Sequence, residues 1–189
     1  MNDQEIWNRF LEGDKDALSR VFINYHDDLF NYGMKLASDT DIVKDAIQDL
    51  FLKLWKNRQN LHAVQILKPY LFKSLRRHIH DSIELNKPWH SIRPEEEAVF
   101  QVEYSHEDFL IDQQINNENY QKVICALNQL TPRQREAIYL RYFEDMDFEN
   151  IAQVMDMNVQ SVRNVIYRGI QVMRDLMLLQ AFFFMLGKS

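Results

Sequence analysis

Side chains that can pair with nucleic-acid bases gather around SVRNVIYRG, residues 161–169. Amide, guanidinium and phenol groups alternate there with aliphatic residues at spacings of three and four, as on a two-faced helix. The polar face holds Gln160, Asn164, Tyr167 and Gln171, flanked by Arg163 and Arg168. Such groups pair with base edges and phosphates, and residues 157–174 contain no Asp or Glu. The stretch therefore predicts a DNA-contacting helix, with a purely protein-binding helix as the alternative.

The elements that must position this helix form a helix-turn-helix in the sequence. Thr131 and Gln134 form a capping box around Pro132, which predicts the start of one helix. A second helix is expected to begin after Asp147 and to end at about residue 155. Asn158 then caps the DNA-contacting helix, at the spacing of a helix-turn-helix. The buried side of that helix is predicted to hold Val162, Val165, Ile166, Gly169, Val172 and Met173.

A second candidate nucleic-acid site lies in KPYLFKSLRRHIHDSIEL, residues 68–85. Its apolar face is formed by Leu71, Phe72, Leu75, Ile79 and Ile83. Its other face is formed by Tyr70, Lys73, Ser74, Arg77 and His80, with Arg76 beside them. Cations attract phosphates and an aromatic ring stacks on bases of an opened strand, although a charged helix face is usually only solvated.

The segment TDIVKDAIQDLFLKLWKN, residues 40–57, predicts a helix capped near its first residues. Its core stripe is expected to contain Val43, Ala46, Ile47, Leu50 and Leu54. The opposite face holds Asp45, Gln48, Asp49, Leu52, Trp55 and Lys56. A leucine and a tryptophan on a polar face indicate either packing against another helix of the chain or docking of another protein.

Composition predicts an all-α fold. The 189 residues include four glycines, four prolines and one cysteine, which leaves few breakpoints for strands and turns and allows no internal disulfide. We find no secretion signal and no membrane-spanning stretch in the sequence, so a cytoplasmic location is expected.

Charge changes sign along the chain and suggests two helical domains joined by an acidic linker. Residues 1–52 carry 5 basic and 11 acidic side chains, whereas residues 53–87 carry 8 and 2. Residues 94–118 hold 8 acidic side chains and no Lys or Arg. We therefore predict domains at 1–87 and 119–175, a linker at 88–118 and an apolar tail at 176–189.

Enzymatic function is not expected from this sequence. The six histidines and Cys125 lack the paired spacing of a zinc site. EDMDFEN, residues 144–150, lacks the glycine and the ligand pattern of a calcium loop. Phosphate-binding glycine loops and nucleophile motifs are also missing. We expect no catalytic residue, no metal and no cofactor.

The chain resembles a known family. ALSRVFINYHDDLFNYGMKLASDTDIVKDAIQDLFLKLWKN followed by KPYLFKSLRRHIHD is similar to region 2 of extracytoplasmic-function (ECF) sigma factors. LTPRQREAIYLRYFEDMDFENIAQVMDMNVQSVRNVIYRG is similar to their region 4. The resemblance implies a dissociable subunit of bacterial RNA polymerase that directs promoter-specific initiation. The alternative is a helix-turn-helix regulator or interaction adaptor that acts without core polymerase.

The resemblance also assigns roles to residues. Core polymerase would be bound by Asp45, Gln48, Asp49, Leu52 and Trp55. The opened minus-ten element would be captured by the loop RQNLHAVQI and by Tyr70, Lys73, Ser74, Arg76, Arg77 and His80. The minus-thirty-five element would be contacted by Gln160, Ser161, Arg163, Asn164, Tyr167 and Arg168, with Ser161 and Arg168 on phosphates. The expected partners are core RNA polymerase, promoter DNA and an anti-sigma factor.

Two further expectations concern shielding of apolar and basic surface. The tail LMLLQAFFFML, residues 176–186, is too short to cross a bilayer and would continue the preceding helix. It is expected to pack on its own domains, or else to bind an anti-sigma factor or a second copy of the chain. The acidic linker is expected to fold back over the basic segment 53–87 and to weaken DNA binding by the free protein.

Overall fold

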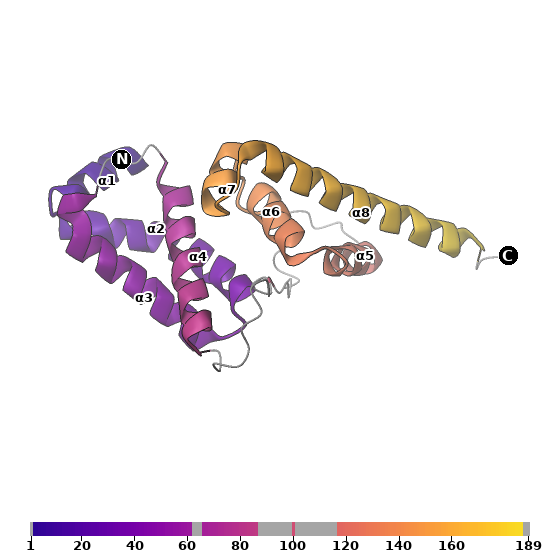
Figure 1. The fold of residues 1–189 in the computed structure, drawn as a ribbon, viewed down its shortest axis with the longest axis horizontal. Coiled ribbons are helices and arrows are strands. Elements are labelled where there is room, and N and C mark those ends of the chain that lie inside the picture. The colour runs from indigo at the N-terminus through magenta and orange to yellow at the C-terminus, as the bar shows by residue number, and fades with distance from the viewer. Residues whose placement is uncertain (1, 62–65, 87–99, 101–116, 187–189) are drawn as a thin grey trace.

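The computed structural model describes residues 2–61, 66–86, 100 and 117–186, and within them it contains eight α-helices, a short 3₁₀ helix and no strand. The N-terminal unit comprises α1 (Asp3–Leu11), α2 (Lys15–Leu36), α3 (Thr40–Asn57), the 3₁₀ helix η1 (Arg58–Asn60) and α4 (Leu67–Asn86). The C-terminal unit comprises α5 (Asn117–Asn128), α6 (Pro132–Tyr142), α7 (Phe148–Val154) and α8 (Val159–Leu186). The predicted all-α fold is confirmed, and Figure 1 shows the two units side by side.

In the N-terminal unit, α2 packs against α1, α3 and α4. The predicted core stripe of α3 is buried throughout: Val43, Ala46, Ile47, Leu50 and Leu54. Asp39 caps α3 by accepting from the backbone N–H groups of Asp41 and Ile42. Gly33 allows α2 to approach α3 closely, since a Cβ atom at this position would lie 2.7 Å from Val43 Cγ1.

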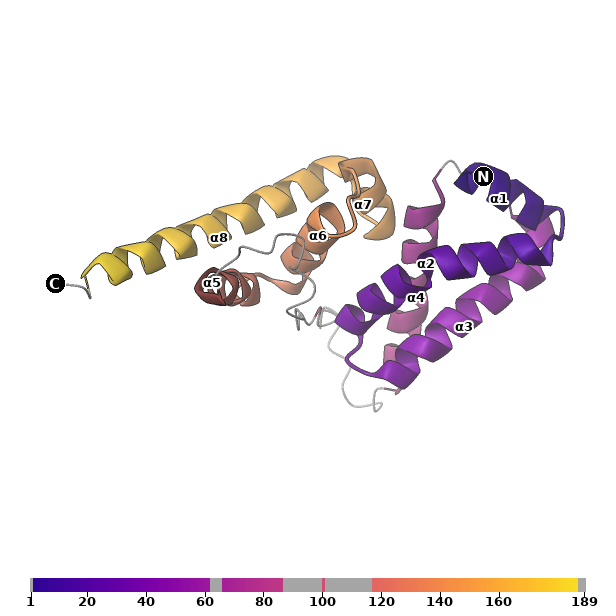
Figure 2. The same cartoon turned by 180° about the vertical axis from the view of Figure 1, so that it is seen from behind.

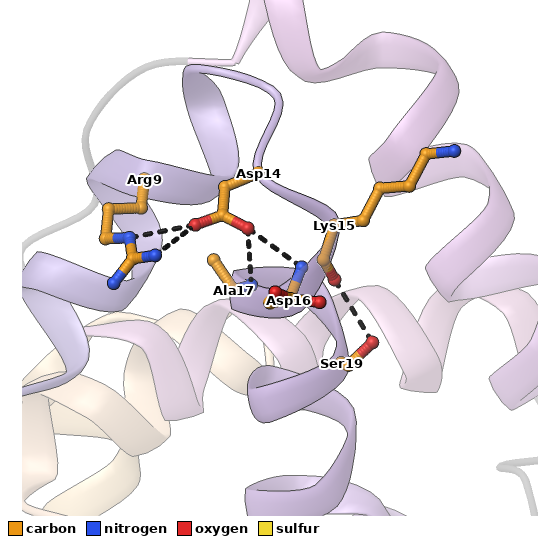
Figure 3. Close-up of polar contacts among 6 residues, drawn as sticks. All are labelled: Arg9, Asp14, Lys15, Asp16, Ala17 and Ser19. Atoms are coloured by element: carbon orange, nitrogen blue, oxygen red, sulfur yellow. Dashed lines mark hydrogen bonds and ion pairs between the residues drawn. The ribbon is translucent and has the colours of Figure 1, made fainter.

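The corner between α1 and α2 is fixed by a single carboxylate (Figure 3). Asp14 Oδ1 accepts from the backbone N–H groups of Asp16 and Ala17 at 2.8 and 3.3 Å, while Oδ2 accepts from Arg9 Nε at 2.8 Å. The backbone bond from Ala17, followed by the bond from Arg9, lowers the pKa of Asp14. The preceding Gly13 has a φ of +96°, which a glycine adopts without strain. The corner holds α1 against α2.

In the C-terminal unit, α8 packs against α5, α6 and α7. The predicted capping box is present, with Thr131 Oγ1 accepting from Gln134 N and Gln134 Oε1 accepting from Thr131 N. Asn158 caps α8 by accepting from Ser161 N at 2.7 Å. At Gly169 a Cβ atom would lie 2.8 Å from Ile138 Cδ1, so α8 and α6 are in close contact there. The predicted helix starts therefore agree with the structure.

The two units share one continuous apolar core. Tyr32 of α2 stacks on Phe72 of α4, with ring centroids 4.8 Å apart, and on Tyr139 of α6, with centroids 6.2 Å apart. Phe100, from the predicted linker, is fully buried between Tyr32 and Tyr139. Arg135 Nη1 donates to the backbone carbonyl of Phe100 at 2.9 Å. One aromatic residue of an otherwise acidic stretch therefore joins the two units.

The C-terminal helix α8 continues without a break through the predicted boundary at residue 175 (Figure 2). No glycine or proline stands between Gly169 and Gly187, so nothing in the sequence ends the helix earlier. The predicted contacts of the tail concern side chains of residues 177–189, which lie outside the described ones. Among the described residues, no helix is long and apolar enough to cross a membrane.

Candidate polymerase and DNA interfaces

The outer face of α3 is accessible, on the side opposite its buried stripe. Asp45, Gln48 and Asp49 are exposed, and Leu52 retains 46% of its accessible surface. A large aliphatic side chain left exposed among carboxylates and an amide suits the centre of a protein interface. Four of the five residues predicted to contact polymerase therefore lie on one accessible surface.

An apolar groove of about 690 Å³ between α2 and α3 adjoins this face. From α2 it is lined by Leu18, Phe22 and His26, and from α3 by residues that include Phe51 and Leu52. The Phe22 ring packs edge-on against Phe51, with centroids 5.0 Å apart, and lies 4.9 Å from the His26 ring. The sequence reasoning missed the contribution of α2. The sequence feature that could have indicated it is the pair Phe22 and His26, four residues apart on one face of α2.

Trp55, the fifth predicted polymerase contact, is only partly exposed because it also packs within the chain. The Arg58 guanidinium lies over its ring at 4.3 Å, and the Phe10 ring lies 6.4 Å away. Arg58 Nη1 also donates to the backbone carbonyl of Trp55 at 2.9 Å. Internal packing, one of the two alternatives drawn from the sequence, therefore applies to Trp55, whereas Leu52 remains exposed.

On α4, Tyr70 and Ser74 are partly buried beside the N-terminal helix. The Tyr70 ring packs edge-on against Trp7 of α1 at 5.7 Å. Ser74 Oγ donates to the backbone carbonyl of Tyr70 at 2.8 Å. Burial raises the pKa of the Tyr70 phenol, which keeps that group neutral. These two predicted minus-ten residues sit at the joint of α1 and α4.

Two cations of α4, the partly buried Lys73 and the exposed Arg77, face a carboxylate of the helix-turn-helix. Lys73 Nζ donates to Asp156 Oδ1, and Arg77 Nη2 donates to Asp156 Oδ2 at 3.1 Å. Asp156 lies in the turn between α7 and α8, with a φ of 52°. The bond from Lys73, followed by the bond from Arg77, lowers the pKa of Asp156 and keeps it charged. The turn before α8 is thereby attached to α4.

Arg76 takes part in a more deeply buried network. Its Nε and Nη2 atoms donate to Oε1 and Oε2 of Glu136 on α6, at 2.8 and 3.3 Å. The Tyr32 hydroxyl donates to Glu136 Oε1 at 2.6 Å. Burial, together with the charge of Glu136, raises the pKa of Tyr32 well above its usual value, so the phenol remains a donor. Tyr32, Arg76 and Glu136, from α2, α4 and α6, therefore satisfy one another's hydrogen-bonding groups in the shared core.

His80, the last predicted minus-ten residue, lies one turn beyond Arg76 on α4. Its Nε2 atom is buried and has no hydrogen-bond partner among the described residues. Burial and the positive charge of Arg76 lower the pKa of His80, and the carboxylates of Glu136, Glu84 and Asp81 oppose that shift. The ring is therefore held neutral at the edge of the network.

The predicted reading face of α8 is exposed. Gln160, Arg163, Asn164 and Arg168 are exposed, Ser161 is partly exposed, and the Tyr167 side chain retains 64% of its accessible surface. Val162 and Ile166 of the opposite face are buried. Amide, phenol and guanidinium groups along one side of a helix that follows a short turn have the arrangement that enters a major groove.

Arg163 has contacts that the sequence did not predict. Its Nη2 atom lies 3.5 Å from Glu149 Oε1, and its guanidinium lies over the Phe148 ring at 5.3 Å. Arg141 covers the same ring at 5.1 Å. Gln160 Nε2 donates to Asn164 Oδ1 at 3.2 Å. Three residues of the predicted reading face therefore also have partners within the chain.

Comparison with known families matches both halves of the chain. Residues 21–87 match the family model of Sigma-70 region 2, and residues 120–173 match that of Sigma-70, region 4. The two matches together cover more than half of the chain.

Similar proteins cover the chain almost from end to end. The ECF RNA polymerase sigma factor SigX of Bacillus subtilis is 23% identical over 167 residues, which are 85% of this chain and 83% of the relative. The RNA polymerase sigma-H factor of Pseudomonas aeruginosa is 23% identical over 173 residues, 88% and 89% of the two chains. The ECF RNA polymerase sigma-E factor of Haemophilus influenzae is 24% identical in an alignment of 189 positions that covers 93% of this chain and 95% of the relative.

Two solved structures share the fold. CnrH in complex with the cytosolic domain of CnrY matches with a TM-score of 0.63 and 16% identity, over 95% of this chain and 97% of that one. RpoE in complex with the anti-sigma factor NepR, from Bartonella quintana, matches with a TM-score of 0.57 and 20% identity, over 84% and 95%. With both sigma regions present in order, the chain belongs to the sigma-70 family, as an ECF RNA polymerase sigma factor.

Proposed function

We propose that this sigma factor binds core RNA polymerase through the outer face of α3, captures the opened minus-ten strand on α4 and reads the minus-thirty-five element with α8. One observation carries this proposal above the others. An exposed leucine among polar groups on α3, a cationic face on α4 and an exposed polar face on α8 occur together in one chain whose two halves match sigma regions 2 and 4.

Binding of polymerase at α3 is supported by the exposure of Leu52 beside Asp45, Gln48 and Asp49. The apolar groove next to Leu52 extends the surface available to a partner helix. Charged and amide groups around an exposed aliphatic anchor set the orientation of such a complex, and the anchor supplies most of the affinity.

DNA recognition is divided between two helices of different character. On α8 the amides of Gln160 and Asn164, with Arg163, are suited to base edges, whereas Arg168 and Ser161 are suited to phosphates. On α4 the cations Lys73, Arg76 and Arg77 are suited to the backbone of a separated strand. Phosphodiester chemistry belongs to the polymerase, so no residue here is assigned a catalytic role.

We further propose an anti-sigma factor as a partner and the cytoplasm as the location. One of the two solved structures above is the sigma factor RpoE in complex with the anti-sigma factor NepR, and the other is CnrH in complex with the cytosolic domain of CnrY. The groove between α2 and α3 offers apolar surface of the kind that an amphipathic helix covers. A sigma factor must also reside where RNA polymerase resides.

Run-off transcription with purified core polymerase tests the proposed function. Genomic fragments from the source organism serve as templates, and transcript starts are mapped by sequencing. We expect transcripts that require both the sigma factor and the core enzyme, with a shared upstream sequence. Leu52→Asp should abolish them, whereas Asp145→Asn, an exposed change in the turn before α7, should not. Binding of the chain to DNA without any polymerase-dependent transcript would support the regulator alternative instead.

A further inference from the structure

The cations proposed to hold the minus-ten strand are engaged by carboxylates of the C-terminal unit. Asp156 pairs with Lys73 and Arg77, and Glu136 pairs with Arg76. At the start of the same helix, Lys68 Nζ lies 2.8 Å from Glu144 Oε2 of the C-terminal unit and 3.1 Å from Asp28. Four successive cations of α4 are therefore paired. Their partners across the joint are three carboxylates of the C-terminal unit: Glu136, Glu144 and Asp156.

A carboxylate and a phosphate use these cations in the same way. Glu136 receives two N–H groups of Arg76 in a forked geometry, which is also the geometry by which arginine binds a phosphate. Asp156 bridges two cations one turn apart on α4, as a phosphate of a bound strand would. A strand and the C-terminal unit therefore cannot hold the same three side chains together.

The joint excludes a strand by shape as well as by charge. α7 packs directly against α4, and Figure 1 shows the end of α7 beside α4. Behind this contact lie the buried rings of Tyr32, Phe72, Phe100 and Tyr139. Exposed ion pairs alone contribute little, so the apolar joint and the buried Glu136 pair are what keep the units together.

We propose that the C-terminal unit is an intramolecular competitor of the minus-ten strand, with Asp156 and Glu136 occupying the places of strand phosphates until the two units separate. The inference rests on the proposed role of α4 in strand binding. It differs from shielding by the acidic linker, because the carboxylates concerned belong to the folded helix α6 and to the turn after α7.

Binding of single-stranded DNA without polymerase tests this competition. The probe is a fluorescein-labelled oligonucleotide of mixed sequence, because phosphate contacts do not depend on sequence. Asp156→Asn is compared with Asp145→Asn; both residues are exposed, and their φ values are 52° and 50°, which asparagine tolerates. Both variants lose one negative charge, but only Asp156 is paired with cations of α4.

We expect Asp156→Asn to bind the oligonucleotide about twofold to tenfold more tightly than Asp145→Asn, as two exposed pairs are lost and the open population rises. The salt dependence should also steepen, by about 0.7 in the slope of log K against log salt for each freed cation. Equal affinities and slopes for the two variants would overturn the proposal.

Small-angle X-ray scattering of the full chain provides the second readout. The double variant Glu136→Gln with Asp156→Asn should have a larger radius of gyration than the wild type, with its helical circular dichroism retained. An expanded variant that binds the oligonucleotide no better than the wild type would also overturn the competition. Normal run-off transcription alongside that result would leave the proposed function standing. If the wild-type chain supported no polymerase-dependent transcription, that result would instead refute the proposed function itself.

Discussion

Replacing Glu136 by alanine should separate the two units without unfolding either. The substitution leaves the Arg76 guanidinium without its carboxylate and the Tyr32 hydroxyl without its acceptor. Removing one partner of a buried ion pair costs about 3–5 kcal/mol. The Arg76 side chain is 21% exposed and can reach some water, so we expect a value near the lower end, about 3 kcal/mol.

The free-energy cost of Glu136→Ala cannot exceed the free energy that holds the two units together. When α4 moves away from α6, Arg76 and Tyr32 become solvated, so the cost of leaving them buried without a partner no longer applies. The free energy of closure is therefore the most that Glu136→Ala can remove from the closed form. Each unit retains its own buried residues, such as Leu50 and Leu71 in one and Ile151 and Val162 in the other.

Urea unfolding followed by circular dichroism, together with small-angle scattering, measures the effect. In Glu136→Ala we expect an expanded particle and a transition that separates into two steps, with native helical content before the first. The control is Arg76→Met with Glu136→Met, which removes both charges and should restore a compact particle, because neither charge is left buried alone. Unchanged scattering and an unchanged unfolding curve for Glu136→Ala would refute the view that the Arg76–Glu136 pair holds the two units together.

Three other predictions test the remaining surfaces. Leu52→Ala should weaken core-polymerase binding by about tenfold in a pull-down titration, with unchanged thermal stability, since the side chain is already 46% exposed. Asn164→Ala should cost about 1–3 kcal/mol at the cognate upstream element and relax its preferred sequence, whereas Arg168→Ala should weaken all promoters in a library equally. His80 has a lowered pKa, so its neutral ring stabilises the folded chain above about pH 6.5, and this contribution is lost as pH falls through the lowered pKa. The thermal unfolding midpoint should therefore fall on acidification to about pH 5, less so in His80→Gln, and an identical pH response of that variant would count against the role of His80.

Elements governed by local spacing could be predicted from the sequence. The buried stripe of α3 follows from apolar residues that recur every three or four positions, and the structure buries all five of them. The caps at Asp39, Thr131 and Asn158 follow from side chains that satisfy backbone N–H groups within three residues. Information of this kind lies within one helical turn, so no knowledge of the tertiary fold was needed.

The joint between the units could not be predicted, because its partners are far apart in the chain. Glu136 and Arg76 are separated by 60 residues, and Lys73 and Asp156 by 83. Charge counts predicted that the acidic linker shields the basic segment, and this stays a prediction. In the described residues, the C-terminal carboxylates that pair with cations of α4 come from α6, the turn before α7 and the turn after α7. The linker contributes Phe100, and its remaining residues lie outside the described ones.

The separate positions of α3 and the joint have a consequence for the order of binding. In Figure 1, α3 lies on the far side of α4 from α7, so the exposed Leu52 face of α3 remains accessible while the cations of α4 are paired with the C-terminal unit. If the free energy of closure is about 3 kcal/mol, roughly one molecule in 150 is open. The apparent affinity for a single strand is then lowered by the same factor. From the proposed sites we expect polymerase to bind the closed chain at α3 and the strand at α4 to be excluded from it. If polymerase also holds α8 at a distance from α4, it supplies the free energy of opening, and strand capture then follows polymerase binding rather than preceding it.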